Sequence, residues 1–350
     1  MKNSTINKNN FITSNKFAKI ADVIFSQNIS VENKEGLTDI KIMSGSNNPH
    51  HKSIIYKKTK FNIKSDSIIF SHSNYINELF YILKQMNQIK NLTLITSQSD
   101  KSVNKKIYSK KPESINNWFS INNLAFESVT SIPLGLGNDF SKKNINNNDL
   151  IDLNFESYKK KNPNLYLNFN VNTNPFERSY LMDYFKQFEW VSIENNVEKK
   201  KYMNSLKESS FVLCPPGNGY DTHRVWETLY SGSIPVVKEN EAFDQFKDLP
   251  ILFVTSFELV TRQLLENFLN NFEISNYNIE KLDIAYWEKK MTQYKKTNKE
   301  VEISYKVENL YYSIFYVVED TYNKYLKKLK AFFYKIFFKL NKFRNTRFLR

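Results

Sequence analysis

Short apolar runs alternate with longer amphipathic stretches along most of the chain. The short runs are rich in β-branched and aromatic residues, which is typical of buried strands. The longer stretches place apolar residues three and four positions apart, as Ile76, Leu79 and Leu83 are, and this spacing predicts helices. The predicted strands are 39–43, 53–56, 67–71, 91–97, 129–137 (ending in a glycine turn), 164–170, 190–194, 210–214 and 251–254. The predicted helices are 74–86, 112–122, 174–188, 198–209, one that starts near residue 221, 257–272, 279–296 and about 301–328.

The alternation stops once, in the polar, non-periodic stretch 141–154, and then restarts. Alternating strands and helices predict parallel sheets covered by helices. We therefore expect an α/β protein with two successive Rossmann-like lobes, one over 1–150 and one over 160–300, joined by a linker that reaches about Asn162. Residues 1–35 show no clear periodicity, and we expect them to be irregular.

The composition favours a folded cytoplasmic protein. Of the 350 residues, 41% are hydrophobic and 15% are aromatic, which is enough to build sizeable cores. Cys214 is the single cysteine, so the sequence excludes disulfides and thiolate metal clusters and predicts a reducing compartment. The N-terminus is polar and lacks an apolar signal core, and no uncharged apolar run of about 18 residues is present. The four histidines are scattered, and we expect no metal site.

The positive charge is concentrated at the C-terminus. Residues 324–350 hold ten of the 50 Lys and Arg residues and none of the 36 acidic residues, which leaves the rest of the chain nearly neutral. Leu326, Leu329 and Phe333 recur there at helical spacing, opposite a lysine-rich face, as in helices that lie in anionic membrane interfaces. We expect a closing helix over 301–323, followed by a basic amphipathic tail that holds the protein on the inner face of the membrane. The alternatives are a helix docked on the protein's own core and an arm that binds nucleic acid.

The stretch FVLCPPGNGYDTHRVWETLYSGSIPVV, residues 211–237, carries the densest candidate chemistry. The chain has only seven glycines, and Gly217, Gly219 and Gly232 lie here. Glycine admits positive φ and lets a ligand approach the backbone closely. The glycine-containing loop follows the predicted strand 210–214, and ligands of parallel α/β sheets bind beyond the carboxyl ends of the strands. The loop is therefore expected to line a binding site.

The helix after this loop begins near Asp221, and either Asp221 or Thr222 can cap it. Its exposed amides and the positive end of its dipole form an anion site. Arg224 can donate to phosphate oxygens with His223 as a nearby donor, and Glu227, one turn further on, can accept from ribose hydroxyls. Arg224 and the helix N-terminus would stabilise the charge of a diphosphate leaving group without a metal.

This segment resembles the donor site of the exostosin-like glycosyltransferases (glycosyltransferase family 47 and its bacterial and viral relatives). The family's pattern is an apolar strand, a Ser/Cys-Pro-x-Gly loop, Asp-x-x-Arg, Trp-Glu-x-Leu and Gly-x-Ile-Pro-Val, and every part stands in this sequence. KPESINNWFSINN with SIPLGLGND is similar to the end of the family's N-terminal lobe, and LYLNFNVNTNPFERSYLMDYF to the start of its C-terminal lobe. The resemblance covers roughly residues 65–255.

The resemblance implies a GT-B fold, in which two Rossmann-like lobes enclose the active site. It implies a metal-independent hexosyl- or pentosyltransferase that needs no cofactor besides a nucleotide-diphosphate sugar. We expect a UDP-linked rather than a GDP-linked donor and an inverting transfer, with a retaining transfer, which needs no base, as the alternative. The acceptor expected is a glycan or a lipid-linked sugar in surface polysaccharide or glycoconjugate synthesis. Carried over to this chain, the donor-binding residues are Arg178, Pro216, Gly217, Asn218, Gly219, Asp221, Thr222, His223, Arg224 and Glu227, of which Arg224 also acts in catalysis.

An inverting transfer also needs a base that deprotonates the acceptor hydroxyl, and the first lobe would supply it. His72 follows the predicted strand 67–71 and precedes a helix, which predicts a position at the cleft, and its ordinary pKa suits a base. Asp100 and Asp139 are the alternatives at equivalent strand ends.

Other functions fit parts of the pattern. A fucosyltransferase-like GT-B enzyme that uses GDP-fucose would carry Thr-Glu-Lys in the helix where this chain has Arg-Val-Trp-Glu-Thr. A non-catalytic nucleotide- or glycan-binding module is the second alternative, although the intact pair of Arg224 and Glu227 argues against a decayed site. A nucleic-acid-binding protein fits poorly, because only the tail supplies positive charge.

Overall fold

The computed structural model describes residues 5–48, 51–125, 128–138, 140–158, 162–295 and 302–306, together with Tyr322 and Tyr325. The chain divides into two units, 1–306 and 307–350, and every element discussed below belongs to the first. The predicted basic tail at 324–350 therefore lies outside the described residues, apart from Tyr325.

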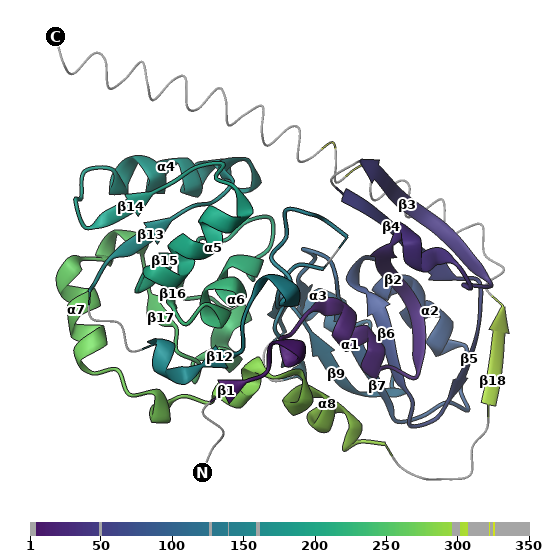
Figure 1. Cartoon of the computed structure of the whole chain (residues 1–350). Coiled ribbons are helices and arrows are strands. Elements are labelled where there is room, and N and C mark those ends of the chain that lie inside the picture. Colours follow the sequence, from purple (N-terminus) through teal and green to yellow (C-terminus); the bar gives the residue numbers. More distant parts are fainter. Residues whose placement is uncertain are drawn as a thin grey trace. The chain divides into compact units, whose positions relative to one another are not determined.

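The first sheet has seven strands in the order β11-β9-β7-β6-β2-β4-β3 (Figure 1). Strands β11, β9, β7, β6 and β2 run parallel, and β3 and β4 form an antiparallel hairpin on the β2 edge. Its strands are β2 (Val23–Ser30), β3 (Ile40–Asn48), β4 (His51–Lys58), β6 (Ile68–His72), β7 (Leu92–Ser97), β9 (Ile115–Ser120) and β11 (Thr130–Ser131). The helices in this part of the chain are α1 (Ser14–Ile20), α2 (Ile76–Lys84) and α3 (Lys105–Tyr108).

The second sheet has five parallel strands in the order β14-β13-β15-β16-β17. Its strands are β13 (Leu165–Leu167), β14 (Val191–Ile193), β15 (Phe211–Leu213), β16 (Ile234–Lys238) and β17 (Leu252–Val254), and its helices are α4 (Pro175–Phe185), α5 (Lys199–Glu208), α6 (His223–Tyr230) and α7 (Arg262–Asn270). The chain passes from β13 to one neighbour, β14, and then returns to the other, β15. Such a reversal opens a crevice beyond the carboxyl ends of these two strands, where ligands of open α/β sheets bind.

Three pairs of short strands complete the fold. They are β1 (Thr5–Ile6) with β12 (Leu153–Asn154), β8 (Val103–Asn104) with β10 (Asn123–Leu124), and β5 (Lys60–Lys64) with β18 (Glu302–Lys306). The segment 141–154, which we expected to be a linker, thus supplies a strand. Just after it Tyr158 is fully buried, and its hydroxyl donates to the Leu229 carbonyl of α6.

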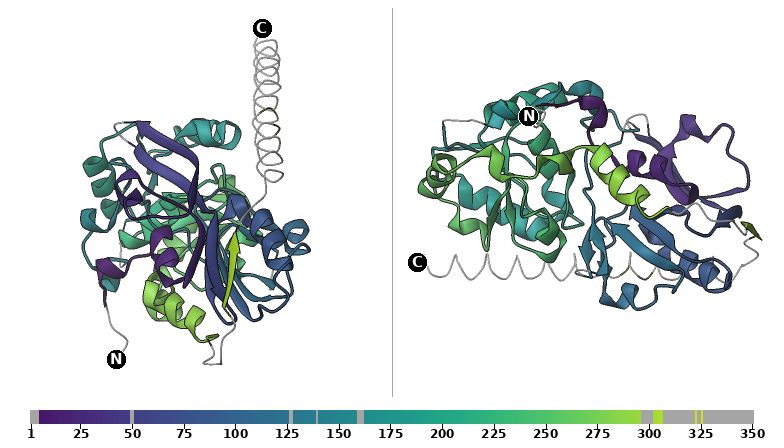
Figure 2. Two further views of the ribbon diagram at one scale, coloured as in Figure 1. Left: turned by 90° about the vertical axis from the view of Figure 1, so that its right-hand side faces the viewer. Right: turned by 90° about the horizontal axis from the view of Figure 1, so that it is seen from below.

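Helix α8 (Ile284–Thr292) follows the second sheet in the chain but lies against α1 (Figure 2). Its buried Trp287 has its ring centroid 6.5 Å from that of Phe17 in α1 and 6.4 Å from that of Phe246, which follows β16. One continuous apolar core includes residues of both sheets and of α8. Among the described residues, no helix is long and apolar enough to cross a bilayer.

The predicted α/β class is confirmed, and most predicted elements are present, but three segments were assigned wrongly. Residues 1–35 contain α1 and β2, a strand inside the sheet. Residues 112–122 contain β9, not a helix. This strand lies between the parallel strands β7 and β11, and its side chains Ile115, Trp118 and Phe119 are buried. Within the predicted closing helix, residues 302–306 form β18, whose Ile303 and Tyr305 alternate with exposed polar residues as a strand requires.

Gly135, in the loop after β11, has no room for a side chain. Its φ is +73°, and a Cβ there would lie 2.3 Å from the Ile12 carbonyl oxygen, which accepts a hydrogen bond from the amide of Leu136 (2.8 Å). We expect Gly135→Ala to lower the free energy of unfolding by more than about 2 kcal/mol, because the backbone must shift. Gly36→Ala is the matched control: its φ is +85° but no atom lies within 4 Å, so it should cost only about 1 kcal/mol. Urea unfolding of both variants tests this, and equal losses would contradict it.

Candidate functional site

The loop from Cys214 to Thr222 joins β15 to α6 at the point where the strand order of the second sheet reverses. Phe169, which follows β13, is buried beside this loop. The guanidinium carbon of Arg178 lies 5.4 Å from the centroid of the Phe169 ring, and that of Arg224 lies 5.8 Å from it. The structure thus brings together Arg178 from α4 and Arg224 from α6, as the sequence predicts for a phosphate site.

Arg178 holds the loop in place. Its side chain is buried, and it donates to the carbonyls of Pro216 (3.0 Å), Pro215 (2.9 Å) and Asn170 (2.8 Å) and to Thr173 Oγ1 (2.6 Å). Burial first, and then the nearby Arg224 charge, lower the pKa of Arg178 to about 10. Most of the N–H donors of Arg178 are thus used within the protein, which does not favour phosphate binding. Its role as a phosphate ligand stays a prediction.

Arg224, unlike Arg178, keeps a side-chain donor without a partner among the described residues. This donor is its Nε, which is buried. Burial lowers the pKa of Arg224, but the surrounding groups, Tyr202 first, outweigh burial and raise it overall, so the side chain is charged. Two guanidinium groups on one ring, with a buried donor left over, form a positive site that an anion would complete.

The N-terminus of α6 is also without a cap. Thr222 occupies the N-cap position, but its side chain accepts no hydrogen bond from the helix, and Thr222 Oγ1 is buried without a partner among the described residues. Thr222 therefore does not cap the helix through its side chain, whereas the Asp221 carboxylate, one residue earlier, bonds to the backbone of Thr222. An uncapped helix N-terminus beside a charged arginine is a suitable seat for phosphate oxygens.

Glu227 lies one turn further along α6. Its Oε2 accepts a hydrogen bond from the hydroxyl of Tyr202 in α5 (2.8 Å). Burial raises the pKa of Tyr202 well above its usual value, so the phenol keeps its proton and donates. This bond holds the carboxylate and leaves Oε1 without a hydrogen bond among the described residues. Glu227 can therefore accept from a hydroxyl of a ligand, as predicted for a ribose.

Asp221 joins the loop to the first part of the chain. Its carboxylate is buried and accepts from the amide of Leu134 (2.8 Å) and from Trp226 Nε1 (2.7 Å), and its own amide donates to Asn122 Oδ1 (2.9 Å). Burial raises the pKa of Asp221 to about 7, although these hydrogen bonds oppose the shift. Asp221 thus lies among protein groups, and its predicted contact with the donor stays a prediction.

His223 contacts the same part of the first sheet. Its Nδ1 donates to the carbonyl of Gly135 (2.7 Å). Nearby, Gln245 accepts from the amide of Ser131 (2.9 Å) and donates to the carbonyl of Val129 (2.9 Å). The start of α6 and the segment after β16 are therefore both bonded to β11 and the residues beside it.

The two loop glycines lie close to side chains of other segments. Neither Gly217 nor Gly219 has a positive φ. A Cβ on Gly217 would lie 3.1 Å from Arg178 Nη2, and a Cβ on Gly219 would lie 3.0 Å from Asn122 Nδ2. The glycines thus admit protein side chains, while Asn218 between them is exposed to solvent.

His72, the candidate base, is buried at the end of β6, with only 2% of its surface exposed. Its Nδ1 accepts from the amide of Asn74 (3.3 Å), and the ring also bonds to the backbone of Gln98. Burial lowers the pKa of His72 to about 4. The assignment of His72 as the base stays a prediction that this environment does not favour, because a base must reach the acceptor hydroxyl.

The two alternative bases differ in what the structure describes. Asp100 is exposed beyond β7. Asp139 lies outside the described residues. Within the described part of the chain, no group of three or more His, Cys, Asp or Glu side chains is placed to hold a metal ion.

Sequence reasoning missed Tyr202, Phe169 and Asn122. Tyr202 stands in a run of lysines on α5 and gains its role only because α5 packs beside α6. Phe169 reads as an ordinary strand residue. Asn122 adopts a φ of +48°, which asparagine tolerates, but nothing local in the sequence points to its bond with Asp221.

Part of the chain is similar to a known protein family. Residues 170–303 match the family model described as the RXYLT1 C-terminal domain. The similarity is to an exostosin-like glycosyltransferase domain, so it supports the family resemblance at that level and indicates a glycosyltransferase. The match covers less than half of the chain; it includes Arg178, Arg224 and Glu227 and leaves out His72. No curated protein matches the chain.

The raised pKa of Asp221 gives a test of its burial. Between its ordinary pKa of 3.8 and about 7, the folded protein holds a proton that the unfolded chain releases. The stabilisation from this group is therefore complete below pH 4 and is lost as the pH rises through 7. We expect the difference in free energy of unfolding between the wild type and Asp221→Asn, measured with urea, to shrink from about pH 4 to about pH 8.

The surface carboxylate Asp244, which pairs with Lys247, provides the control. The difference between the wild type and Asp244→Asn should stay nearly constant over the same pH range, because exposed ion pairs contribute little. A pH-independent difference for Asp221→Asn would show that this carboxyl titrates normally in the fold and would contradict its assigned environment.

Proposed function

We propose that this protein is an inverting GT-B glycosyltransferase that transfers a sugar from a nucleotide-diphosphate donor, a UDP-sugar rather than a GDP-sugar, to a glycan or lipid-linked acceptor. The diphosphate binds beyond the carboxyl ends of β13 and β15. The observation that carries the proposal is the charged Arg224 at an uncapped helix N-terminus, with its buried Nε unpaired among the described residues. The similarity of residues 170–303 to an exostosin-like glycosyltransferase domain supports it.

Different residues of α6 bind different parts of the donor. The amides at the start of the helix and the guanidinium of Arg224 bind the diphosphate. Glu227 accepts from a ribose hydroxyl, held in position by Tyr202. Arg178 fixes the loop so that these groups converge. Each interaction is with a part of the donor common to all nucleotide-diphosphate sugars, so the sugar itself is selected elsewhere.

In the transfer step, the acceptor oxygen forms a bond to the anomeric carbon while the bond from that carbon to the diphosphate breaks. Negative charge accumulates on the leaving diphosphate, and Arg224 and the helix N-terminus lower its energy. No metal is needed for this stabilisation in the mechanism we propose. A base takes the proton of the acceptor hydroxyl, and in an inverting reaction it lies on the face opposite the leaving group.

Nucleotide binding tests the role of Arg224. We expect Arg224→Ala to weaken UDP binding by about 100-fold or more, because two charge-assisted hydrogen bonds are lost. Isothermal titration calorimetry measures the affinity, and circular dichroism checks the fold. The matched control is Arg262→Ala on α7, whose exposed side chain pairs with Glu266, and its affinity should equal that of the wild type. UDP affinity retained in Arg224→Ala would refute the assignment.

Turnover separates an enzyme from a binding module. We expect the protein, incubated with a panel of UDP- and GDP-sugars and acceptor glycans, to release a free nucleoside diphosphate from one donor. Release from GDP-fucose alone would favour the fucosyltransferase-like alternative. Donor binding without release of a nucleoside diphosphate would favour a non-catalytic module. The absence of both binding and release would contradict the proposed function.

The membrane location is a separate proposal from the sequence. The basic amphipathic residues 324–350 would hold the enzyme on the cytoplasmic face of a membrane, near a lipid-linked acceptor. We expect a chain lacking 324–350 to lose binding to vesicles that contain phosphatidylserine or phosphatidylglycerol, measured by co-sedimentation. Equal sedimentation of the full and shortened chains would contradict the anchor role.

A further inference from the structure

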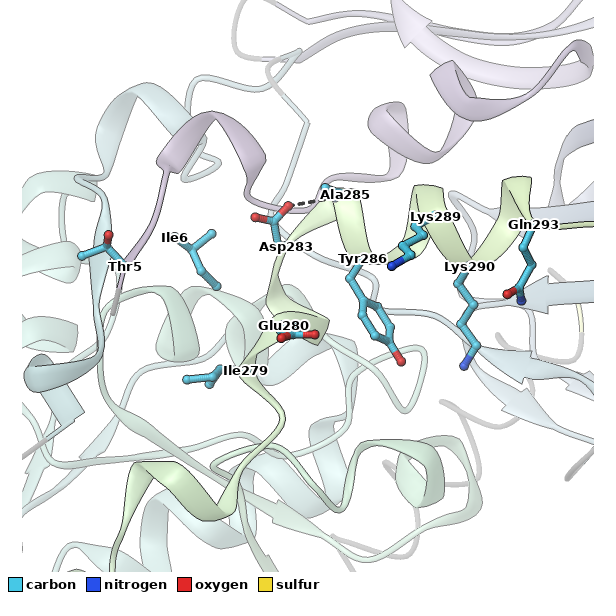
Figure 3. A pocket seen from close by; sticks show the side chains of 10 residues that line it. All are labelled: Thr5, Ile6, Ile279, Glu280, Asp283, Ala285, Tyr286, Lys289, Lys290 and Gln293. Carbon is cyan, nitrogen blue, oxygen red and sulfur yellow. Dashed lines mark hydrogen bonds between the residues drawn. The ribbon is translucent and has the colours of Figure 1, made fainter. Parts of the chain in front are cut away.

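A cavity of about 600 Å³ lies where β1, α8 and the turn Ile279–Leu282 meet (Figure 3). Ten residues line it, and none of them belongs to the candidate site around α6. Its size is within the range of pockets that hold small ligands.

The charges of the lining select against an ionic ligand. Glu280 and Asp283 supply two carboxylates, and Lys289 and Lys290 supply two ammonium groups. An anion would be attracted by one pair and repelled by the other, and so would a cation. An uncharged ligand rich in hydroxyl groups could instead donate to the carboxylates and accept from the lysines and from Gln293.

The apolar part of the lining consists of Ile6, Ile279, Ala285 and the aromatic ring of Tyr286. Tyr286 is partly buried, and its ring plane stands at 85° to that of the buried Trp287, with the centroids 5.1 Å apart. Lys290 Nζ lies 5.8 Å from the Tyr286 centroid, and burial followed by Asp248 and Glu280 raises the pKa of Tyr286, so the phenol is neutral. Such a ring, fixed between charged neighbours (Figure 3), suits the C–H face of a sugar ring, whose hydroxyls then meet the polar groups around it.

The cavity is preformed, and hydrogen bonds connect it to helix α6. Asp283 Oδ1 accepts from the amide of Ala285 and Oδ2 accepts from Asn10 Nδ2, which fixes the start of α8. The preceding carbonyl, of Leu282, accepts from the hydroxyl of Tyr230 at the end of α6 (2.7 Å). Little ordering of the protein is therefore needed when a ligand binds.

We propose that this cavity binds one uncharged sugar unit of an extended acceptor glycan, away from the point of transfer. The proposal deepens the proposed function and depends on it for the identity of the ligand as an acceptor. A second contact of this kind would raise the affinity of a long acceptor above that of a short one through effective concentration.

Saturation-transfer NMR with four neutral disaccharides (maltose, cellobiose, lactose and chitobiose) tests the site. We expect at least one to bind the wild type, and Tyr286→Ala and Gln293→Ala to weaken its binding by about tenfold and several-fold, respectively. The matched controls are Tyr180→Ala in α4 and Gln187→Ala just after it, both exposed, whose affinities should equal that of the wild type. Gln293→Ala keeps the test valid if Tyr286→Ala fails to fold.

Three results would overturn the proposal. They are the absence of binding by any of the four disaccharides, equal binding by the wild type and both cavity variants, and binding of inorganic phosphate that Lys289→Gln abolishes. UDP binding is measured on the same samples and should be unchanged in the cavity variants. If the wild type does not bind UDP, the proposed function fails, while the disaccharide results still decide whether the cavity binds sugar.

Discussion

The buried carboxylate of Asp221 is the contact on which the geometry of the candidate site depends. It accepts from the amide of Leu134, in the loop after β11, and from the indole of Trp226 in α6. Together with the bond from His223 to Gly135, it places the start of α6 against the loops of the first sheet. The position of Arg224, in the first turn of that helix, therefore depends on contacts between segments far apart in the sequence.

The site holds two neighbouring positive charges, those of Arg178 and Arg224. Two guanidinium groups lie near the ring of Phe169, and the hydrogen bonds of Arg178 go to neutral acceptors rather than to a carboxylate. Keeping two like charges together under burial costs free energy, as the lowered pKa of Arg178 reflects. A bound diphosphate would remove this cost, and the proposed function therefore explains an arrangement that is otherwise unfavourable.

The sequence predicts well what depends on local pattern. The parallel strands of the second sheet and helices α4, α5 and α6 follow from apolar runs and helical spacing, and the cluster of Arg224 and Glu227 follows from their spacing on one helix. It predicts poorly what tertiary contacts decide. β9 looked like a helix because a proline precedes a polar stretch, yet its neighbours β7 and β11 make it a strand.

Tertiary contacts also decide the surroundings of the predicted site residues. Asp221 has the residue type of a helix cap, but its carboxylate also bonds to Leu134 and Trp226, and the sequence gives no sign of the bond to Leu134. His72 stands at a strand end, as a base at the cleft should, but its ring is buried and bonds to the backbone of Asn74 and Gln98, which the sequence could not indicate. The cavity beside α8 has no sequence signal at all, because β1, the turn at 279–282 and α8 meet only in the fold.

The most direct test of the central claim is a crystal structure of the protein grown with UDP. The account predicts density for the diphosphate at the N-terminus of α6, with its oxygens within hydrogen-bond distance of the Arg224 guanidinium and a ribose hydroxyl on Glu227. Diphosphate density at any other place, with Arg224 untouched, would contradict it.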